Sequence, residues 1–114
     1  MNITTREEEG VTIVTLDGKM TIGEGDVKLR EEVRDLLDRG AKKIILDLNG
    51  VRTMDSSGLG ELVRCKTVAQ DAGATIKLLH VQDKVQQVLE MTRLIGVFED
   101  YNDEIDALAS FREG

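Results

Sequence analysis

The feature that most constrains the fold is a continuous apolar run from Lys43 to Leu48, followed by a short polar segment and an apolar-periodic helix. A strand this apolar is usually covered on both faces, so we expect it to be central in its sheet. The polar segment, Met54 to Gly60, then forms a strand-to-helix turn. Parallel strands are joined by crossover helices of this kind, so the passage indicates an α/β fold.

The rest of the chain alternates between predicted strands and helices. β-branched residues predict a first strand from Val11 to Leu16. Asp17-Gly18 is a hairpin signal, which makes Lys19 to Ile22 the return strand. We expect helices over residues 26–39, 58–71, 82–91 and 102–111, and further strands over residues 74–81 and 97–98.

These elements predict one α/β domain, residues 1–114, with a mixed sheet of four or five strands and about four helices. Residues 43–48 and 75–79 should be interior strands. Asp26 is a fair start for the first helix and Gly40 a fair stop, while Asn102 or Asp103 should cap the last helix.

Charge and composition restrict the partners. The net charge is −7, which argues against nucleic acid and anionic lipid and favours a basic partner surface. The single cysteine allows no disulfide within the chain. We find no leader peptide and no long apolar run, so we expect a cytoplasmic protein with no membrane contact.

No catalytic motif accompanies the fold. A nucleophile elbow needs a glycine two residues before its serine, and neither Ser56 nor Ser57 has one. Gly58 and Gly60 begin a dinucleotide fingerprint, but its third glycine is replaced by Val63. One histidine and one cysteine make no metal cluster. We therefore expect no enzyme, cofactor or metal, and His80 should be a strand residue at the sheet surface rather than a general base.

The Met54–Gly60 turn places two hydroxyls at a helix start. Free backbone N–H groups and the helix dipole favour negative charge there, so a serine in this turn is either a plain cap or a phosphorylation site. A phospho-aspartate receiver is the competing fold, and it would need an acidic pair after the first strand. Asp17 stands alone, and Asp47 lies within its strand rather than beyond it.

The sequence also predicts which of several other side chains are buried and which are exposed. Met20, Met54, Met91 and Cys65 should fill the core. Arg64 and Lys66 should point outward, either as solubilising charges or as neighbours of the turn. Leu59 and Leu62 should point inward. Residues 19–26 carry two glycines and exposed acids without an apolar stripe, so we expect a surface loop beside Ser56.

The strand from Ile44 to Leu48, the spacer from Asn49 to Thr53 and the Met54–Gly60 turn together resemble the signature block of the STAS domain, the fold of bacterial anti-sigma factor antagonists. The order of elements agrees from Val11 to Phe111. The resemblance implies that Ser56 is phosphorylated by an anti-sigma factor serine kinase. The unphosphorylated form would bind this kinase and free a sigma factor, and a metal-dependent serine phosphatase would reset it.

The resemblance also implies site residues. Asp55, Ser57 and Gly58 would complete the phosphosite turn, with Ser57 mainly a structural cap. The predicted partner-binding residues are Thr21, Glu24, Asp26, Leu59 and Arg64. Thr21 stands where many antagonists carry an aspartate. A second hypothesis remains open: a STAS adaptor or scaffold subunit of a stress-sensing or lipid-transport complex, in which Ser56 is only a cap.

Overall fold

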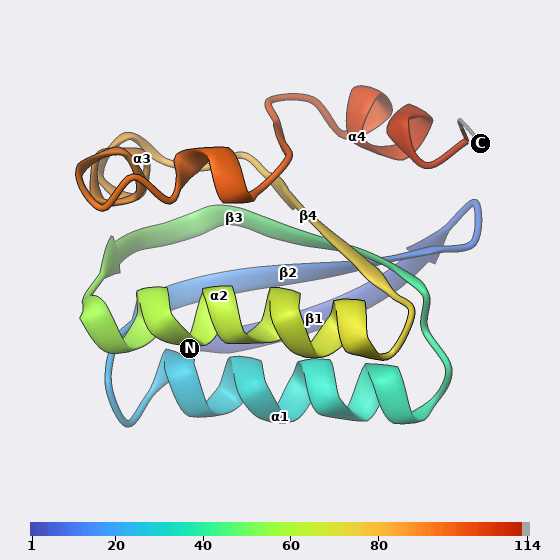
Figure 1. The fold of residues 1–114 in the computed structure, drawn as a ribbon, viewed down its shortest axis with the longest axis horizontal. Helices are drawn as coiled ribbons and strands as arrows, with labels where there is room; N and C mark the ends of the chain where they lie inside the picture. Colours follow the sequence, from blue (N-terminus) through green and yellow to red (C-terminus); the bar gives the residue numbers. More distant parts are fainter. Residues whose placement is uncertain (113–114) are drawn as a thin grey trace.

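The structure is a computed structural model that describes residues 1–112 as a five-stranded sheet with four α-helices and one 3-10 helix (Figure 1). The strands are β1 (Asn2–Glu8), β2 (Val11–Met20), β3 (Lys43–Met54), β4 (Thr75–Leu79) and β5 (Asp100–Tyr101). The helices are α1 (Gly25–Asp38), α2 (Ser56–Asp71), α3 (Asp83–Met91), the 3-10 helix η1 (Ile95–Val97) and α4 (Glu104–Ser110).

The sheet is mixed, as predicted. Its strand order is β1-β2-β3-β4-β5, with β1 and β2 antiparallel and every other pair parallel. Both strands predicted to be interior, β3 and β4, have a neighbour on each side. The continuous apolar run of β3 therefore lies in the middle of the sheet, where both of its faces are covered.

The hairpin at the amino end differs from the prediction. The turn is at Glu9-Gly10, where both residues have positive φ, and it joins β2 to an unpredicted strand, β1. β1 is an exposed edge strand and carries almost no apolar alternation for sequence analysis to detect. Asp17-Gly18 is not a turn: it lies within β2, where the pairing with β3 shifts register. Of the predicted return strand, Lys19 and Met20 are the carboxyl end of β2, and Thr21 and Ile22 lie beyond it.

The carboxyl-terminal prediction is also wrong in part. Val97 belongs to η1 and Phe98 is buried in the core, while the short last strand, β5, follows at Asp100–Tyr101. Two consecutive apolar residues do not distinguish a strand from a core-packed turn. The cap of α4 is confirmed: the Asp103 side chain accepts hydrogen bonds from the backbone N–H groups of Ile105, at 2.7 Å, and Asp106.

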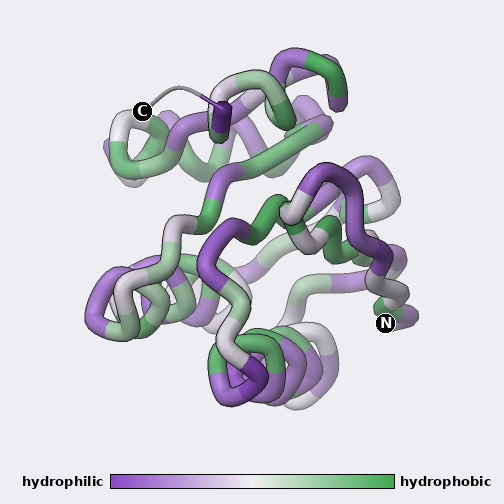
Figure 2. Tube along the Cα trace, turned by 90° about the vertical axis from the view of Figure 1, so that its right-hand side faces the viewer, coloured by the Kyte–Doolittle hydropathy of each residue, from purple (hydrophilic) through white to green (hydrophobic). Residues whose placement is uncertain are grey.

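Alternate residues of the central strands belong to two cores. Ile44 and Leu46 belong to the larger core together with apolar residues of α1, α2 and α3. Ile45 and Leu79 belong to a smaller core with α4. In Figure 1, α1 and α2 lie side by side, and α4 lies apart from them on the opposite side of the sheet. Figure 2 shows hydrophobic and hydrophilic residues alternating along the helix traces, as amphipathic helices require.

The sulfur-containing side chains mostly follow the prediction. Met20 and Cys65 are buried and Met54 packs against the larger core. Met91 is an exception because 83% of it is exposed at the end of α3. Met91 is two residues beyond the buried Leu89, about 200° around the helix, so it lies on the face of α3 that points away from the core.

Candidate functional site

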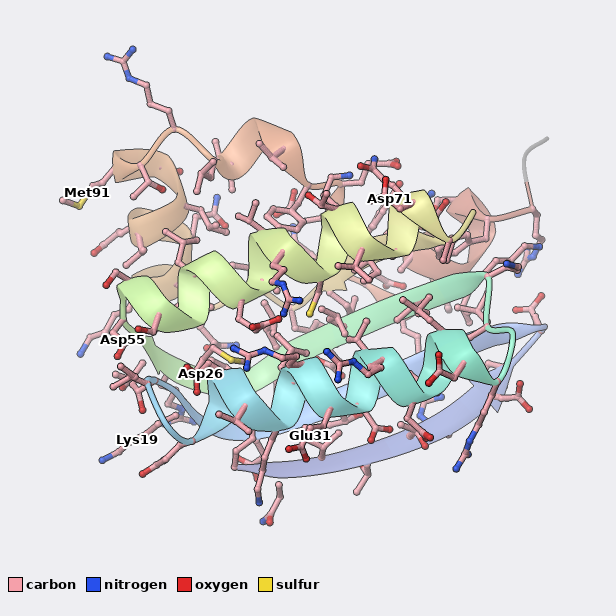
Figure 3. All side chains as sticks on the ribbon, turned by 60° about the horizontal axis from the view of Figure 1, so that its bottom comes forward. Lys19, Asp26, Glu31, Asp55, Asp71 and Met91 are labelled. Carbon is pink, nitrogen blue, oxygen red and sulfur yellow. The ribbon has the colours of Figure 1, made fainter. Side chains whose placement is uncertain are left out.

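The candidate site lies where β2 and β3 end together. Met20 is paired with Met54 at the last register position, and the backbone N–H of Asp55 donates to the Met20 carbonyl at 3.3 Å. The next residue, Ser56, begins α2. Figure 3 shows Asp55, Asp26 and Lys19 gathered at this end of the molecule, while Asp71 lies at the far end of α2.

Asp55 joins the two segments that form this end. Its Oδ1 accepts a hydrogen bond from the Gly58 backbone N–H at 2.9 Å, which caps α2. Its Oδ2 accepts one from the Ile22 backbone N–H at 3.0 Å, in the turn before α1. These bonds, that from Gly58 foremost, lower the pKa of Asp55 below its usual value, because they stabilise the carboxylate. The prediction that Ser57 is the cap is therefore wrong: Ser57 lies inside the first turn, and Asp55 caps the helix.

Two glycines let the helix starts approach β2. A Cβ on Gly58 would overlap the Met20 carbonyl oxygen, and a Cβ on Gly25 would overlap the Lys19 carbonyl oxygen. Gly60, by contrast, has open space around it. Gly58 is therefore required by close backbone packing, whereas Gly60 is not part of a phosphate-binding fingerprint or of a tight contact.

The two serines differ in exposure. Ser56 is exposed and Ser57 is half-buried. Within residues 1–112, no hydrogen bond holds the Ser56 hydroxyl, since the capping interactions are made by Asp55. The serine that the family resemblance favours is thus accessible and free of a structural hydrogen bond.

The expected surface loop over residues 19–26 is shorter than predicted. Lys19 and Met20 belong to β2, and Asp26 lies in the first turn of α1. Asp26 is buried rather than an exposed acid, and its Oδ1 lies 2.7 Å from the Val27 backbone N–H. It is not the cap of α1 either, because that position is Glu24, which makes no side-chain capping bond. Glu24 is exposed and Thr21 is half-buried.

The two predicted partner-binding residues on α2 differ in exposure. Leu59 is buried and packs in the larger core, so it is not available for contact with a partner. Arg64 is exposed, as expected, about two helical turns beyond Ser56. Sequence reasoning missed Ile22, which is 71% exposed and whose backbone bonds Asp55. An isoleucine next to a glycine in a polar turn is its only sequence signal.

The described residues give no support for a serine–histidine pair, a metal site or a membrane span. His80 lies just beyond β4 with positive φ, not within the strand, and its Nδ1 is 3.0 Å from Asp47 Oδ1. In the described part of the chain no serine hydroxyl hydrogen-bonds this ring. The same residues contain no group of three or more potential metal ligands. None of the described helices is both long and apolar enough to span a membrane.

The described residues therefore form an α/β domain with an accessible serine at a capped strand-to-helix turn. A family model of the STAS domain matches residues 2–107, and the chain belongs to the STAS domain family. It is 27% identical over 108 residues to the anti-sigma F factor antagonist of Paenibacillus polymyxa, covering 95% of this chain and 92% of that one.

Solved structures agree with this assignment. The crystal structure of a candidate anti-sigma factor antagonist from Thermotoga maritima matches with a TM-score of 0.89 at 26% identity, covering 97% of this chain and 95% of that one. The phosphorylated form of Bacillus SpoIIAA, a cell fate determinant, matches with a TM-score of 0.69 at 19% identity, covering 94% and 99%, which shows a shared fold alone. The family prediction is confirmed, and the role of Ser56 stays a prediction.

Proposed function

We propose that this protein is a phosphorylation-switched binding module, an anti-sigma factor antagonist rather than an enzyme. In its unphosphorylated form it binds an anti-sigma factor serine kinase in the cytoplasm and so releases a sigma factor. A metal-dependent serine phosphatase returns it to that form. The observation that carries the proposal is the exposed Ser56 hydroxyl, which makes no hydrogen bond of its own in a turn that Asp55 already caps.

The position of Ser56 suits a phosphate. A phosphoserine carries nearly two negative charges at neutral pH, and the positive end of a helix dipole favours such charge. Because Asp55 and Gly58 keep their hydrogen bond whatever Ser56 carries, phosphorylation need not alter α2. The neighbouring carboxylate of Asp55 has a lowered pKa and is ionised at neutral pH, so phosphate would add to an acidic surface. We therefore expect the switch to act by repulsion and steric block, not by refolding.

The proposed footprint surrounds Ser56. Thr21 and Glu24 contribute from the turn before α1, and Arg64 from the exposed side of α2. Asp26 and Leu59 are excluded as contacts because both are buried. Exposed Ile22 adds an apolar contact between the acidic groups. Glu24→Lys should slow association with a basic partner surface, and the salt dependence of the on-rate should fall with it.

Phosphate incorporation tests the proposal. Wild-type protein incubated with cell extract and ATP should gain one phosphate by intact mass, Ser57→Ala should gain the same, and Ser56→Ala should gain none. Labelling that persists in Ser56→Ala and disappears in Ser57→Ala would move the site to Ser57. No phosphate on any of the three would favour the adaptor or scaffold hypothesis.

Partner binding tests the switch separately. A bait of Ser56→Ala should retain the kinase, identified by mass spectrometry, and Ser56→Asp should fold normally and bind it weakly. The matched control is Ser110→Asp, at the end of α4 and far from the turn, provided that its circular dichroism is that of the wild type. A Ser56→Asp protein that binds as tightly as wild type would remove the switch from the proposal.

A further inference from the structure

A hollow of about 220 Å³ lies between α1 and α2, away from the Ser56 turn. Both helices run in the same direction, so their residues line it in matching order (Figure 1). Along the two helices Arg30, Arg34 and Arg64 come before Leu37, Val68 and Ala72, and Asp38 lines the hollow next to Leu37. The small side chains of Cys65 and Ala72 leave room that larger residues would fill.

The arginine end of the hollow carries more positive than negative charge, with three arginines around the single carboxylate of Glu61. Glu61 is buried there and already paired, because Arg30 Nε donates to its Oε1 at 2.8 Å. Arg64 reaches the same carboxylate only at 3.9 Å. Within residues 1–112, no carboxylate lies within ion-pair distance of Arg34. Two exposed arginines, Arg34 and Arg64, thus face outward beside the hollow in a chain of net charge −7.

The other end of the hollow is lined mainly by apolar side chains, with the exposed Asp38 beside them. Val68 is 40% exposed on the outer side of α2 and offers an aliphatic surface to the hollow. Leu37 packs against the larger core and is only partly covered. Cys65 adds a protonated thiol to the floor: its Sγ donates to Glu61 Oε2 at 3.4 Å, and burial raises the pKa of that thiol. The thiol is therefore a lining group and not a nucleophile.

We propose that this hollow is a binding site for a small amphipathic carboxylate, with the carboxylate head on Arg34 and Arg64 and a short aliphatic tail along Leu37, Val68 and Ala72. A positively charged end and a mainly apolar end in one hollow match the two halves of such a ligand. The volume suits a short chain rather than a drug-sized molecule, for which pockets of roughly 300 Å³ or more are usual. The site does not depend on the proposed switch.

A chain-length series tests the tail. Butanoate, hexanoate and octanoate are titrated into the uniformly ¹⁵N-labelled protein, and amide shifts are followed by NMR. Affinity should rise by up to about fourfold for each added methylene, which corresponds to its transfer from water. The largest shifts should fall on Leu37, Arg64 and Val68. A flat series, or shifts centred on another part of the surface, would overturn the proposal.

Charge variants test the head. Arg34→Gln and Arg64→Gln should each weaken hexanoate binding about two- to fivefold, the range of an exposed ion pair. Arg93→Gln is the matched control, because Arg93 is an exposed arginine outside the hollow, and it should leave binding unchanged. Hexylammonium, with the same tail and opposite charge, should bind more weakly than hexanoate. Equal binding of hexylammonium, or equal losses in all three variants, would refute the assignment.

A filling variant tests the location independently. Ala72→Leu places a larger side chain at the apolar end and should remove the gain in affinity between butanoate and octanoate, while butanoate itself still binds. Ala72 is exposed just after α2, so the variant should fold. A chain-length dependence identical to that of wild type, in a variant with an unchanged urea midpoint, would show that the tail binds at another site.

Discussion

The starts of α1 and α2 lie at the same end of the sheet but are held in different ways. α2 begins after Asp55, whose side chain caps it. α1 begins after Glu24, which makes no side-chain capping bond, and the turn before it is held by the Thr21 carbonyl, which accepts from the Glu24 and Asp26 backbone N–H groups at 3.2 and 3.4 Å. Both starts press a glycine against β2. The start of α2 thus has a side-chain cap, whereas the start of α1 has none of its own.

This difference separates structural support from exposed chemistry. The carboxylate of Asp55 caps α2 and also accepts from Ile22 in the turn before α1, so it supports both starts. Within residues 1–112, the Ser56 hydroxyl makes no hydrogen bond that holds either helix start. A residue that carries no structural bond is free to be modified, while its neighbour holds the geometry. Substitutions at this end of the molecule test this division of roles, and their expected effects on stability range from large at Gly58 to small at Ser57.

Gly58→Ala should be the most destabilising change at this end. Its Cβ would overlap the Met20 carbonyl oxygen, which belongs to the backbone and cannot rotate away, so α2 must shift. Overpacking of this kind costs about 1–3 kcal/mol. Gly60→Ala is the control: it has open space and should stabilise the helix by about 0.5–1 kcal/mol. Urea denaturation measures both, and equal effects would contradict the close packing at Gly58.

Asp55→Ala should lower the urea midpoint measurably, although by less than Gly58→Ala does. It leaves the backbone N–H groups of Gly58 and Ile22 without their acceptor. Asp55→Asn offers one carbonyl oxygen in place of two carboxylate oxygens and should fall between Asp55→Ala and wild type. Hydrogen exchange should quicken at Ile22 as well as at Gly58 in Asp55→Ala. Faster exchange at Gly58 alone would show that Asp55 does not join the two starts.

The contribution of Asp55 should also depend on pH. Its pKa is lowered in the folded protein, whereas the unfolded chain has an ordinary value of about 3.9. The stabilisation is therefore complete above the unfolded pKa and is lost as pH falls through the folded pKa. The difference in urea midpoint between wild type and Asp55→Asn should be constant near neutral pH and shrink below about pH 4. A difference that grows on acidification would contradict the assigned direction.

Ser57→Ala should have the smallest effect. Since Asp55 caps α2, we expect a change within about 0.5 kcal/mol, as for ordinary surface positions. Asp103→Ala is the comparison, because Asp103 caps α4 with its side chain and its loss should cost about 1 kcal/mol. A loss from Ser57→Ala as large as that from Asp103→Ala would restore Ser57 as a cap.

The sequence predicts the parts of the fold that carry strong apolar patterns. β3 and β4 are continuous apolar runs, and they are interior strands as expected. β1 is a polar edge strand with one exposed face and an unpaired edge, so no burial pattern marks it. The predicted position of the hairpin is wrong because Asp17-Gly18 has the composition of a turn but lies at a register shift within β2. The turn itself is at Glu9-Gly10.

The candidate site was predictable in its position and not in its bonds. The strand-to-helix turn at residues 54–60 follows from the order of apolar run and helix. Which residue caps the helix depends on where its first turn starts, and the boundary lies two residues earlier than periodicity indicates. That shift transfers the cap from Ser57 to Asp55. The burial of Asp26 depends on packing between α1 and β2, which a single sequence does not contain.

The capping of α2 by Asp55 has an evolutionary consequence. Because the helix start does not use the Ser56 hydroxyl, replacements at this position remove no bond from the described fold. A lineage can therefore exchange serine for threonine, alanine or a permanent acid there, one step at a time, without first acquiring a compensating change. Asp55 and Gly58 lack this freedom, so relatives that do not use a phosphate switch should vary at the position of Ser56 while keeping the two residues that hold the turn.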